Sequence, residues 1–503
     1  MLVDCGLFQG SKTLKELNYG SFPFDLTRLG AVLLTHAHLD HSGLLPKLVR
    51  RGYAGRILAT EGTRDLLAYM LPDAGYVQES EVERLNRRRQ QRGEAPVTPI
   101  YTRADAEAML PRIVASPYDT WVEPMAGIRA RFWRAGHILG SASIELEIDA
   151  AGARPLRLLF SGDLGRSGNA LQLPAQAPTD LDYVVAESTY GDRERPRLSA
   201  EQRRHALRGE VRGALARGGN LIIPAFAVER TQELLFDLSV LFGSGELPEI
   251  PVFLDSPLAV RATEVFAAHS EELGEAARQH PFVRRNFHFT AEVAESKALN
   301  RIHSGAIILA ASGMCDAGRI RHHLKAHLWR RQSTVLLVGY QAPGTLGRLL
   351  QDGAQSVRIE GEEVRVAAQI RTLDTYSAHA DRRELVDWIV AREPIARALI
   401  LTHGENEARA GLARALATRL PAGLAVLQPP LDASLALDRP GIPRLEPAAP
   451  RLPPASLSTL DWHNRYAALA LEIGERLRNA TDAAERESLL RRLEQALTAR
   501  PAE

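Results

Sequence analysis

Three histidines and one aspartate lie within six residues in the segment THAHLDHSG, residues 35–43. They are His36, His38, Asp40 and His41, and they follow the apolar run AVLL. A tight loop after a strand can direct such side chains to one point, and imidazole and carboxylate groups suit zinc, or sometimes iron or manganese. We predict that His36 and His38 bind one ion and that Asp40 and His41 bind a second. The alternative is a polar loop of solvated histidines.

Three further candidate ligands each follow an apolar run that predicts a strand. His137 follows ARFWRAG, Asp163 follows LRLLFSG and His403 follows ALILT. Asp163 is suited to bridge two cations because a carboxylate has two oxygens. The predicted metal ligands are therefore His36, His38, Asp40, His41, His137, Asp163 and His403. This set is about what a two-metal hydrolase needs.

The elements that position these residues alternate between short apolar runs and helical patterns. Strands are predicted at residues 31–35, 56–60, 156–160, 183–187, 220–226, 251–255, 305–310, 334–339 and 398–402, and helices at 62–71, 79–92, 104–110, 200–217, 229–242, 257–268, 381–391 and 406–419. Such alternation predicts α/β layers. The proline-rich stretch 429–456 predicts an extended linker, and residues 457–503 predict a helical hairpin with a break near Asn479–Asp482.

Composition excludes several classes of protein. The 503 residues include 62 Lys and Arg against 61 Asp and Glu, so a net charge of +1 excludes a protein that holds nucleic acid by bulk charge. Only Cys5 and Cys315 are present, which excludes a disulfide scaffold and fits a reducing cytosol. No apolar run approaches the roughly 18 residues of a membrane span. We expect a cytoplasmic protein without a membrane partner.

The motifs HAHLDH, GHILGSA and FSGDLGR, in this order, resemble those of the metallo-β-lactamase superfamily. The later motifs AESTYGDR (186–193), DTYSAHAD (374–381) and LTHGE (401–405) resemble those of its β-CASP branch, whose members process nucleic acids. Segments such as PAFAVERTQELL, LDSPLA, ASGMCDAGRIRHHL and VGYQAPGTLGRLL resemble bacterial and archaeal relatives of the cleavage and polyadenylation nuclease. The resemblance implies an α/β fold: an αββα sandwich with an inserted β-CASP domain, here followed by a C-terminal helical tail.

The resemblance also implies a division of the chain. The predicted domains are residues 1–194 and 369–428 for the sandwich, 195–368 for the β-CASP domain, 429–456 for the linker and 457–503 for the helical hairpin.

The resemblance assigns roles to individual residues. Asp4 is expected to hold the metal-binding side chains in position without binding the metal itself. Two zinc ions are the expected cofactors. A metal-bridged hydroxide would attack the phosphodiester, with Asp40 accepting the proton of the water. His379 would act as the general acid toward the leaving 3′ oxygen, and Glu187 would stabilise its imidazolium. The alternative for His379 is an eighth ligand or a capping residue.

The insert implies single-stranded RNA as the substrate, because a narrow cleft between two domains excludes a duplex. The turn after residue 311 is expected to offer backbone N–H groups to a phosphate. The predicted RNA contacts are Ser312, Gly313, Arg319, His323 and Arg348. The alternative is that these are tight turns and a solvated basic helix. The sequence leaves open the choice between endonuclease and exonuclease, and whether the chain forms a homodimer.

Three alternatives compete with a single-strand ribonuclease. The first is a β-CASP nuclease acting on DNA, which His403 disfavours because DNA-repair members of the family tend to carry valine at this motif. The second is a 5′ exonuclease similar to ribonuclease J. The third is a non-catalytic scaffold, which the complete set of motif residues disfavours.

The start of the sequence carries one more expectation. Only Met1, Leu2 and Val3 precede Asp4, which is shorter than a typical strand. Relatives have one or two further strands before this motif. We therefore expect Met1 to be an internal methionine of a longer protein, which translation of the upstream DNA would test.

Overall fold

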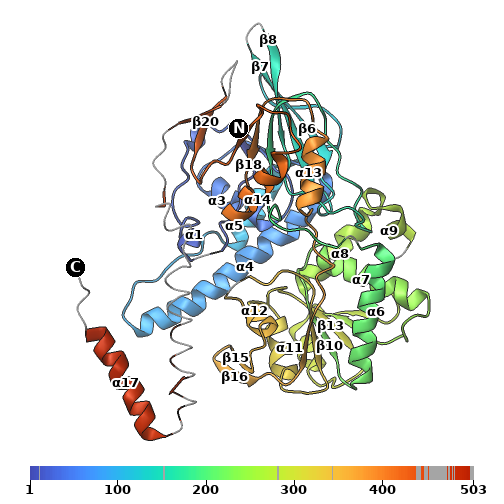
Figure 1. Ribbon diagram of the computed structural model, residues 1–503, viewed down its shortest axis with the longest axis vertical. Coiled ribbons are helices and arrows are strands. Elements are labelled where there is room, and N and C mark those ends of the chain that lie inside the picture. Colours follow the sequence, from blue (N-terminus) through green and yellow to red (C-terminus); the bar gives the residue numbers. More distant parts are fainter. Residues whose placement is uncertain are drawn as a thin grey trace. The chain divides into compact units, whose positions relative to one another are not determined.

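The computed structural model describes residues 1–10, 12–150, 153–196, 198–279, 282–342, 344–437, 443–446, 451–452, 469, 473, 476–477, 480 and 482–498 (Figure 1). These residues form two compact units. The first comprises Met1–Leu7 and Phe22–Ala448, and the second comprises Phe8–Ser21 and Ala449–Glu503. All of the motifs quoted above belong to the first unit.

Two sheets form the sandwich of the first unit. A parallel sheet has the order β1-β2-β3-β4, with β1 at Leu2–Val3, β2 at Ala31–Leu33, β3 at Arg56–Ala59 and β4 at Ile113–Ala115. A larger sheet has the order β19-β18-β9-β8-β7-β6-β5, with β5 at Val122–Met125, β6 at Ile128–Arg134, β7 at Ala142–Ala150, β8 at Ala153–Phe160, β9 at Leu181–Ala186, β18 at Ile395–Leu401 and β19 at Ala425–Leu427. Leu33 from the first sheet and Phe132 and Ile144 from the second share one core between them.

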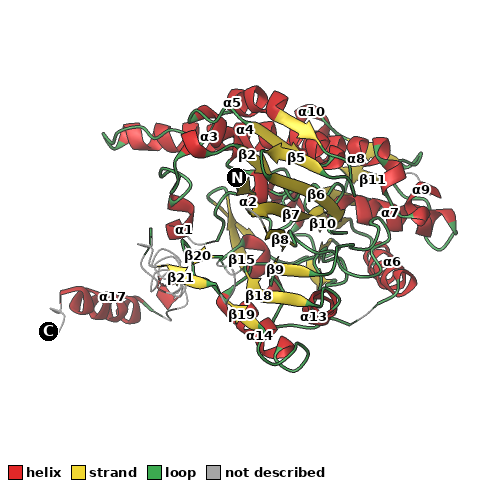
Figure 2. Ribbon diagram, turned by 90° about the horizontal axis from the view of Figure 1, so that it is seen from above, coloured by secondary structure: helices red, strands yellow, loops and turns green. Residues whose placement is uncertain are grey.

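Helices cover the outer face of each sheet, as Figure 2 shows. Helices α3 (Leu45–Arg50), α4 (Glu61–Gln91) and α5 (Arg103–Met109) pack on the smaller sheet, and α13 (Arg382–Val390) and α14 (Asn406–Leu416) pack on the larger one. The order of the layers is therefore helix, sheet, sheet, helix (αββα), which confirms the predicted fold class.

Helix α4 differs from the prediction of two helices at 62–71 and 79–92, because it continues through Pro72. The buried residues of α4 lie in its first half, and a Cβ on Gly75 would lie 2.7 Å from the backbone nitrogen of Arg103 in α5. The apolar pattern is interrupted between the two predicted helices because small residues are needed where α5 approaches.

The directions of the strands bring several loops to one edge of the larger sheet. Strands β8, β9 and β18 are parallel neighbours. Strand β6 runs in the same direction as β8, because both are antiparallel to β7. The residues that follow β6, β8, β9 and β18 therefore lie at the same edge of the sheet.

The inserted domain contains a parallel six-stranded sheet with the order β12-β11-β13-β10-β14-β17. Its strands are β10 (Leu221–Pro224), β11 (Val252–Leu254), β12 (Phe287–Phe289), β13 (Ile307–Ala310), β14 (Thr334–Leu337) and β17 (Gln369–Thr372). Helices α6 (Ala200–Ala216), α7 (Arg230–Gly243) and α8 (Pro257–Ala268) cover one face, and α11 (Ile320–His327), α12 (Leu346–Gln351) and the hairpin of β15 (Ser356–Ile359) and β16 (Glu362–Arg365) cover the other (Figure 1). Short helices α9 (Glu275–Gln279) and α10 (Val293–Leu299) complete the domain.

The structure differs from the sequence prediction at one domain boundary and within the predicted linker. Strand β17 pairs with β14, so the inserted sheet extends beyond the predicted boundary at residue 368. This strand was not predicted because it is a largely polar edge strand with no buried residue and so has no apolar run. In the predicted linker 429–456, β20 (Ser434–Ala436) and β21 (Arg444–Glu446) pair as antiparallel strands. These two strands contain few alternating apolar residues. The prolines around them therefore determined the prediction of a linker.

The predicted tail is only partly described. Helix α17 spans Ala483–Thr498, and the predicted first helix of the hairpin lies largely outside the described residues, as does half of its break near Asn479–Asp482. Helix α1 (Lys12–Glu16) belongs to the same unit. Among the described residues, no helix is long and apolar enough to cross a membrane.

Candidate metal centre

The loop after β2 is held by a carboxylate from the end of β1. Asp4 Oδ1 accepts a hydrogen bond from the Thr35 backbone N–H at 2.7 Å, and its Oδ2 accepts one from the Thr35 hydroxyl at 2.8 Å. The same Oδ2 lies 2.7 Å from His41 Nδ1, at the end of the short helix α2 (Leu39–Ser42). Asp4 therefore fixes the ring of His41 through Nδ1 and leaves Nε2 free to face the loop.

The first group of candidate ligands contains His36, His38, His137 and Asp163. His38 Nδ1 lies 3.1 Å from both His36 Nε2 and His137 Nε2. Asp163 Oδ2 lies 3.7 Å from His36 Nε2 and 3.8 Å from His137 Nε2. Four ligand atoms about 2.0–2.2 Å from one tetrahedral ion are separated by roughly 3.3–3.6 Å. The observed distances therefore fit one zinc-sized cation.

The second group contains Asp40, His41 and His403. The other oxygen of Asp163, Oδ1, lies 3.3 Å from both His41 Nε2 and His403 Nε2. His403 Nε2 also lies 3.9 Å from Asp40 Oδ2. Asp163 thus presents one carboxylate oxygen to each group, as a bridging ligand must.

Burial supports a cation at this position. His41 Nε2 and Asp163 Oδ1 are both buried, and neither has a hydrogen-bond partner among the described residues. Burial lowers the pKa of His38 to about 4, although Asp40 and Asp163 raise it. Burial likewise lowers the pKa of His36 and His137 well below the usual value. These rings are therefore neutral at pH 7, which is the form that binds a metal.

His379 lies beside the bridging carboxylate. Its backbone pairs with Gly165, and the flanking residue Ala380 donates an N–H to Leu164 O at 2.8 Å. His379 Nδ1 lies 3.8 Å from Asp163 Oδ2 and from Glu187 Oε2. Burial by itself lowers the pKa of His379, but the carboxylates of Glu187 and Asp163 outweigh it and raise the pKa. The ring can therefore hold a proton near neutral pH.

Glu187 is nearly fully buried at the end of β9. Its Oε1 accepts a hydrogen bond from the Leu164 N–H, and its Oε2 accepts one from the Thr189 N–H at 3.3 Å. Two hydrogen bonds to backbone fix the carboxylate in place, where it faces His379. The remaining Asp163–Glu187–His379 group is also close enough to hold a metal, so the geometry alone leaves His379 open as a further ligand.

Comparison with protein families assigns each part of the chain. Residues 1–215 match the metallo-beta-lactamase superfamily, 231–350 the Beta-Casp domain and 363–421 the Zn-dependent metallo-hydrolase RNA specificity domain. A protein named Ribonuclease TTHA0252, from Thermus thermophilus, is 37% identical over 427 residues, which cover 83% of this chain and 91% of that protein. The chain belongs to the β-CASP branch of the metallo-β-lactamase superfamily. It is therefore a metallo-hydrolase, and the resemblance found in the sequence is confirmed.

Archaeal β-CASP proteins are also similar. Transcription termination factor FttA of Methanosarcina mazei is 30% identical over 435 residues, covering 84% of this chain and 65% of that protein. The same factor from Pyrococcus abyssi is 33% identical over 419 residues, covering 79% and 61%. The chain thus spans less than two thirds of the length of these factors.

Two predicted RNA contacts in the β-CASP domain have other partners. Arg319 Nη1 donates to Asp255 Oδ1 at 2.7 Å, and His323 Nε2 lies 2.6 Å from Asp255 Oδ2. His323 is 1% exposed. The prediction that His323 contacts RNA is therefore wrong, and most donors of Arg319 are used within the protein. The sequence pattern of a basic helix gave no sign of the buried Asp255 beneath it.

The other predicted contacts surround the same β-CASP turn. The hydroxyl of Ser312 accepts a hydrogen bond from the Ala317 N–H at 3.3 Å, so this turn is closed within itself. A Cβ on Gly313 would lie 2.8 Å from the ring of Phe226, so this aromatic ring packs directly against the turn. Arg348 pairs with Asp352 on α12 at 2.9 Å and is partly exposed.

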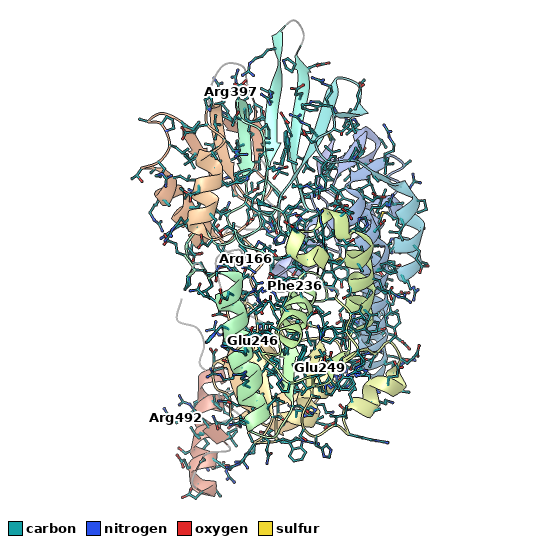
Figure 3. All side chains as sticks on the ribbon, turned by 90° about the vertical axis from the view of Figure 1, so that its right-hand side faces the viewer. Arg166, Phe236, Glu246, Glu249, Arg397 and Arg492 are labelled. Carbon is teal, nitrogen blue, oxygen red and sulfur yellow. The ribbon has the colours of Figure 1, made fainter. Side chains whose placement is uncertain are left out.

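Two arginines near His379 were missed by sequence reasoning. Arg195 donates to the backbone oxygen of His379, and its N–H donates to Asp381 Oδ2 at 3.0 Å. Arg166, labelled in Figure 3, donates to Glu233 Oε1 in α7 at 2.6 Å and so ties the sandwich to the β-CASP domain. The available signal was that Arg166 ends the motif FSGDLGR and that Arg195 comes two residues after the motif AESTYGDR.

The Asp4 contacts lead to a first prediction. Asp4→Asn should lower zinc affinity about 10- to 100-fold, because an amide cannot accept from both Thr35 and His41 as the carboxylate does. Competition with a zinc chelator would measure this affinity. The same change at Asp352, an exposed residue directly after α12, should have no effect. Equal affinity in Asp4→Asn and the parent protein would contradict the supporting role of Asp4.

Proposed function

We propose that the chain is a zinc-dependent ribonuclease that hydrolyses phosphodiester bonds of single-stranded RNA. The observation that carries the proposal is Asp163, which presents one carboxylate oxygen to each of two histidine groups with His379 beside it. The family and the name of the Thermus relative, a ribonuclease, support RNA as the substrate. His403 at the last motif supports the same choice over DNA.

Two zinc ions fit the donor atoms of the site. We propose that His36, His38 and His137 would hold one ion and that Asp40, His41 and His403 would hold the other, with Asp163 shared between them. When bound, such ions lower the pKa of a water molecule and neutralise charge on the phosphate.

The protein's own residues would then move the protons. Asp40 is partly exposed, with one carboxylate oxygen 3.9 Å from His403 Nε2, and would accept the proton of the attacking water. His379 turns Nδ1 to Glu187 and Asp163, so its Nε2 is the nitrogen left to donate a proton to the leaving oxygen. Glu187, fixed by two backbone N–H groups, would hold the imidazolium in this orientation.

The proposed function predicts preference for RNA. A labelled single-stranded RNA should be cut much faster than DNA of the same sequence, and a chelator should abolish the cutting. Elemental analysis should find about two zinc ions per chain. Equal turnover of DNA would contradict the substrate, whereas metal-free protein that still cuts RNA would contradict the whole mechanism.

The mode of cutting needs a separate substrate. An internally labelled RNA with a blocked 5′ end should yield intermediate fragments from an endonuclease and remain intact with a 5′ exonuclease. A cytoplasmic location stays a prediction, and a homodimer stays one of the open alternatives.

A further inference from the structure

An arginine lies between two aromatic rings close to the metal centre. The guanidinium carbon of Arg193 lies 5.3 Å from the ring centre of Tyr190 and 5.8 Å from that of Tyr340. The rings of Tyr190 and His379 form a T-shaped pair with their centres 5.7 Å apart. Tyr190 follows β9 of the sandwich and Tyr340 follows β14 of the β-CASP domain, so this series starts at His379 and crosses to the inserted domain.

Two of the aromatic rings in this region are exposed. Tyr340 is 45% exposed and Phe226 is 41% exposed, and the side chain of Arg193 is 49% exposed. Exposed aromatic side chains that cluster at one place, rather than singly, are typical of a binding surface.

Phe226 and Tyr340 belong to loops that are fixed to each other. Phe226 lies against Gly313, where a Cβ would come within 2.8 Å of its ring, and its backbone oxygen accepts a hydrogen bond from the Thr231 hydroxyl at 2.7 Å. Gln341, next to Tyr340, donates to the backbone oxygen of Gly313 at 3.0 Å. The two rings are therefore presented by an ordered frame, which reduces the entropy lost when a ligand binds.

The topology of the β-CASP sheet places these rings at its ligand-binding edge. Phe226 follows β10, Gly313 follows β13 and Tyr340 follows β14, and these three strands are parallel neighbours. Ligands of open parallel sheets bind outside the carboxyl ends of the strands. Strand β17 is parallel to β14, and the chain after it leads to His379 at the same edge.

We propose that Phe226, Tyr340 and Arg193 form a stacking surface for unpaired nucleobases next to the phosphodiester held at His379. The proposal rests on the proposed function. Aromatic rings and guanidinium planes stack on the flat faces of bases that are not already paired in a duplex. Stacking would also give a chain of net charge +1 an affinity for RNA that bulk charge cannot provide.

The structure offers a matched control on the same strand. Trp329 is 56% exposed, and the guanidinium carbon of Arg330 lies 4.9 Å from its ring centre. It precedes β14, whereas Tyr340 follows β14, so the two aromatic–arginine pairs lie at opposite ends of one strand. Trp329→Ala removes an exposed ring of the same kind at the edge where no base is expected.

The binding test uses the full chain with zinc and the His379→Ala change, which should slow cutting enough for binding to be measured. The probe is a single-stranded RNA that contains 2-aminopurine, whose fluorescence reports stacking. Tyr340→Ala and Phe226→Ala should each weaken binding about 5- to 150-fold. Tyr340→Phe should keep most of the affinity for this RNA. Trp329→Ala should bind it as tightly as the protein that carries the His379→Ala change alone, which is the parent in these comparisons. Similar affinity in the Tyr340→Ala, Phe226→Ala and parent proteins would overturn the stacking surface.

A second probe separates stacking from a general loss of structure. In RNA with abasic residues at the positions next to the cleaved bond, the parent should lose affinity and Tyr340→Ala should lose little more. If Tyr340→Ala lowers the binding affinity by the same factor for the abasic RNA as for the intact RNA, Tyr340 does not contact a base. If the unmodified protein neither cuts nor binds RNA, the proposed function fails as well. If it cuts RNA and the alanine variants match it, only the stacking surface fails.

Discussion

His379→Ala should retain two zinc ions and lose activity about 10²- to 10⁴-fold, the usual contribution of a general acid. The ring is fixed by backbone pairing with Gly165 and lies 3.8 Å from carboxylate oxygens of Asp163 and Glu187. The carboxylates of Glu187 and Asp163 raise its pKa, which favours the protonated form that a general acid needs. Elemental analysis and cleavage rates on the same preparation would check both parts. Loss of zinc from His379→Ala would show that the residue is a ligand and not an acid.

The pH profile gives an independent test of the same role. Because Glu187 raises the pKa of His379, Glu187→Gln should lower it. A general acid acts in its protonated form, so activity declines as pH rises through its pKa. The alkaline limb of the rate profile should therefore move to lower pH in Glu187→Gln while zinc content stays the same. An unchanged alkaline limb would contradict a role of Glu187 in holding the proton on His379.

The positions of the candidate ligands could be predicted because each follows a strand with a clear apolar pattern. His36 follows β2, His137 follows β6, Asp163 follows β8 and His403 follows β18. Parallel direction then brings the carboxyl ends of β8, β9 and β18 together, and this rule depends on no side-chain detail. The grouping of His36 and His38 apart from Asp40 and His41, with Asp163 between the groups, agrees with the geometry of the structure.

Contacts between distant segments could not be predicted from local patterns. Arg319 and His323 look like solvated basic residues, but Asp255, more than 60 residues earlier, accepts hydrogen bonds from both. The exposed rings of Phe226 and Tyr340 carry no sequence period, because they lie in loops after different strands. Strand β17 was missed because edge strands need not be apolar. In each case the information lies in which segments meet, and only the fold supplies it.

Asp163→Asn should remove both zinc ions, which is a larger effect than the loss of any one histidine. Asp163 is 1% exposed, with Oδ2 facing His36 and His137 and Oδ1 facing His41 and His403. Asparagine has nearly the same shape as aspartate but no charge, and its amide nitrogen cannot bind a cation. At least one of the two groups of metal ligands therefore loses the ligand that they share, and both groups lose the negative charge of the carboxylate.

His38→Ala provides the comparison for Asp163→Asn. His38 belongs to the first group only, so this variant should lose the ion of that group and keep part of the second. Zinc content per chain and the melting temperature with and without added zinc would separate the two variants, because an ion that binds only the folded state stabilises it. The parent should melt at a higher temperature with zinc, the melting temperature of His38→Ala should rise less, and that of Asp163→Asn should not rise.

RNA cleavage by Asp163→Asn should fall at least as far as that of His379→Ala, since the site then lacks its cations as well as the negative charge of Asp163. Retention of two zinc ions in Asp163→Asn would show that the carboxylate does not bridge the two groups.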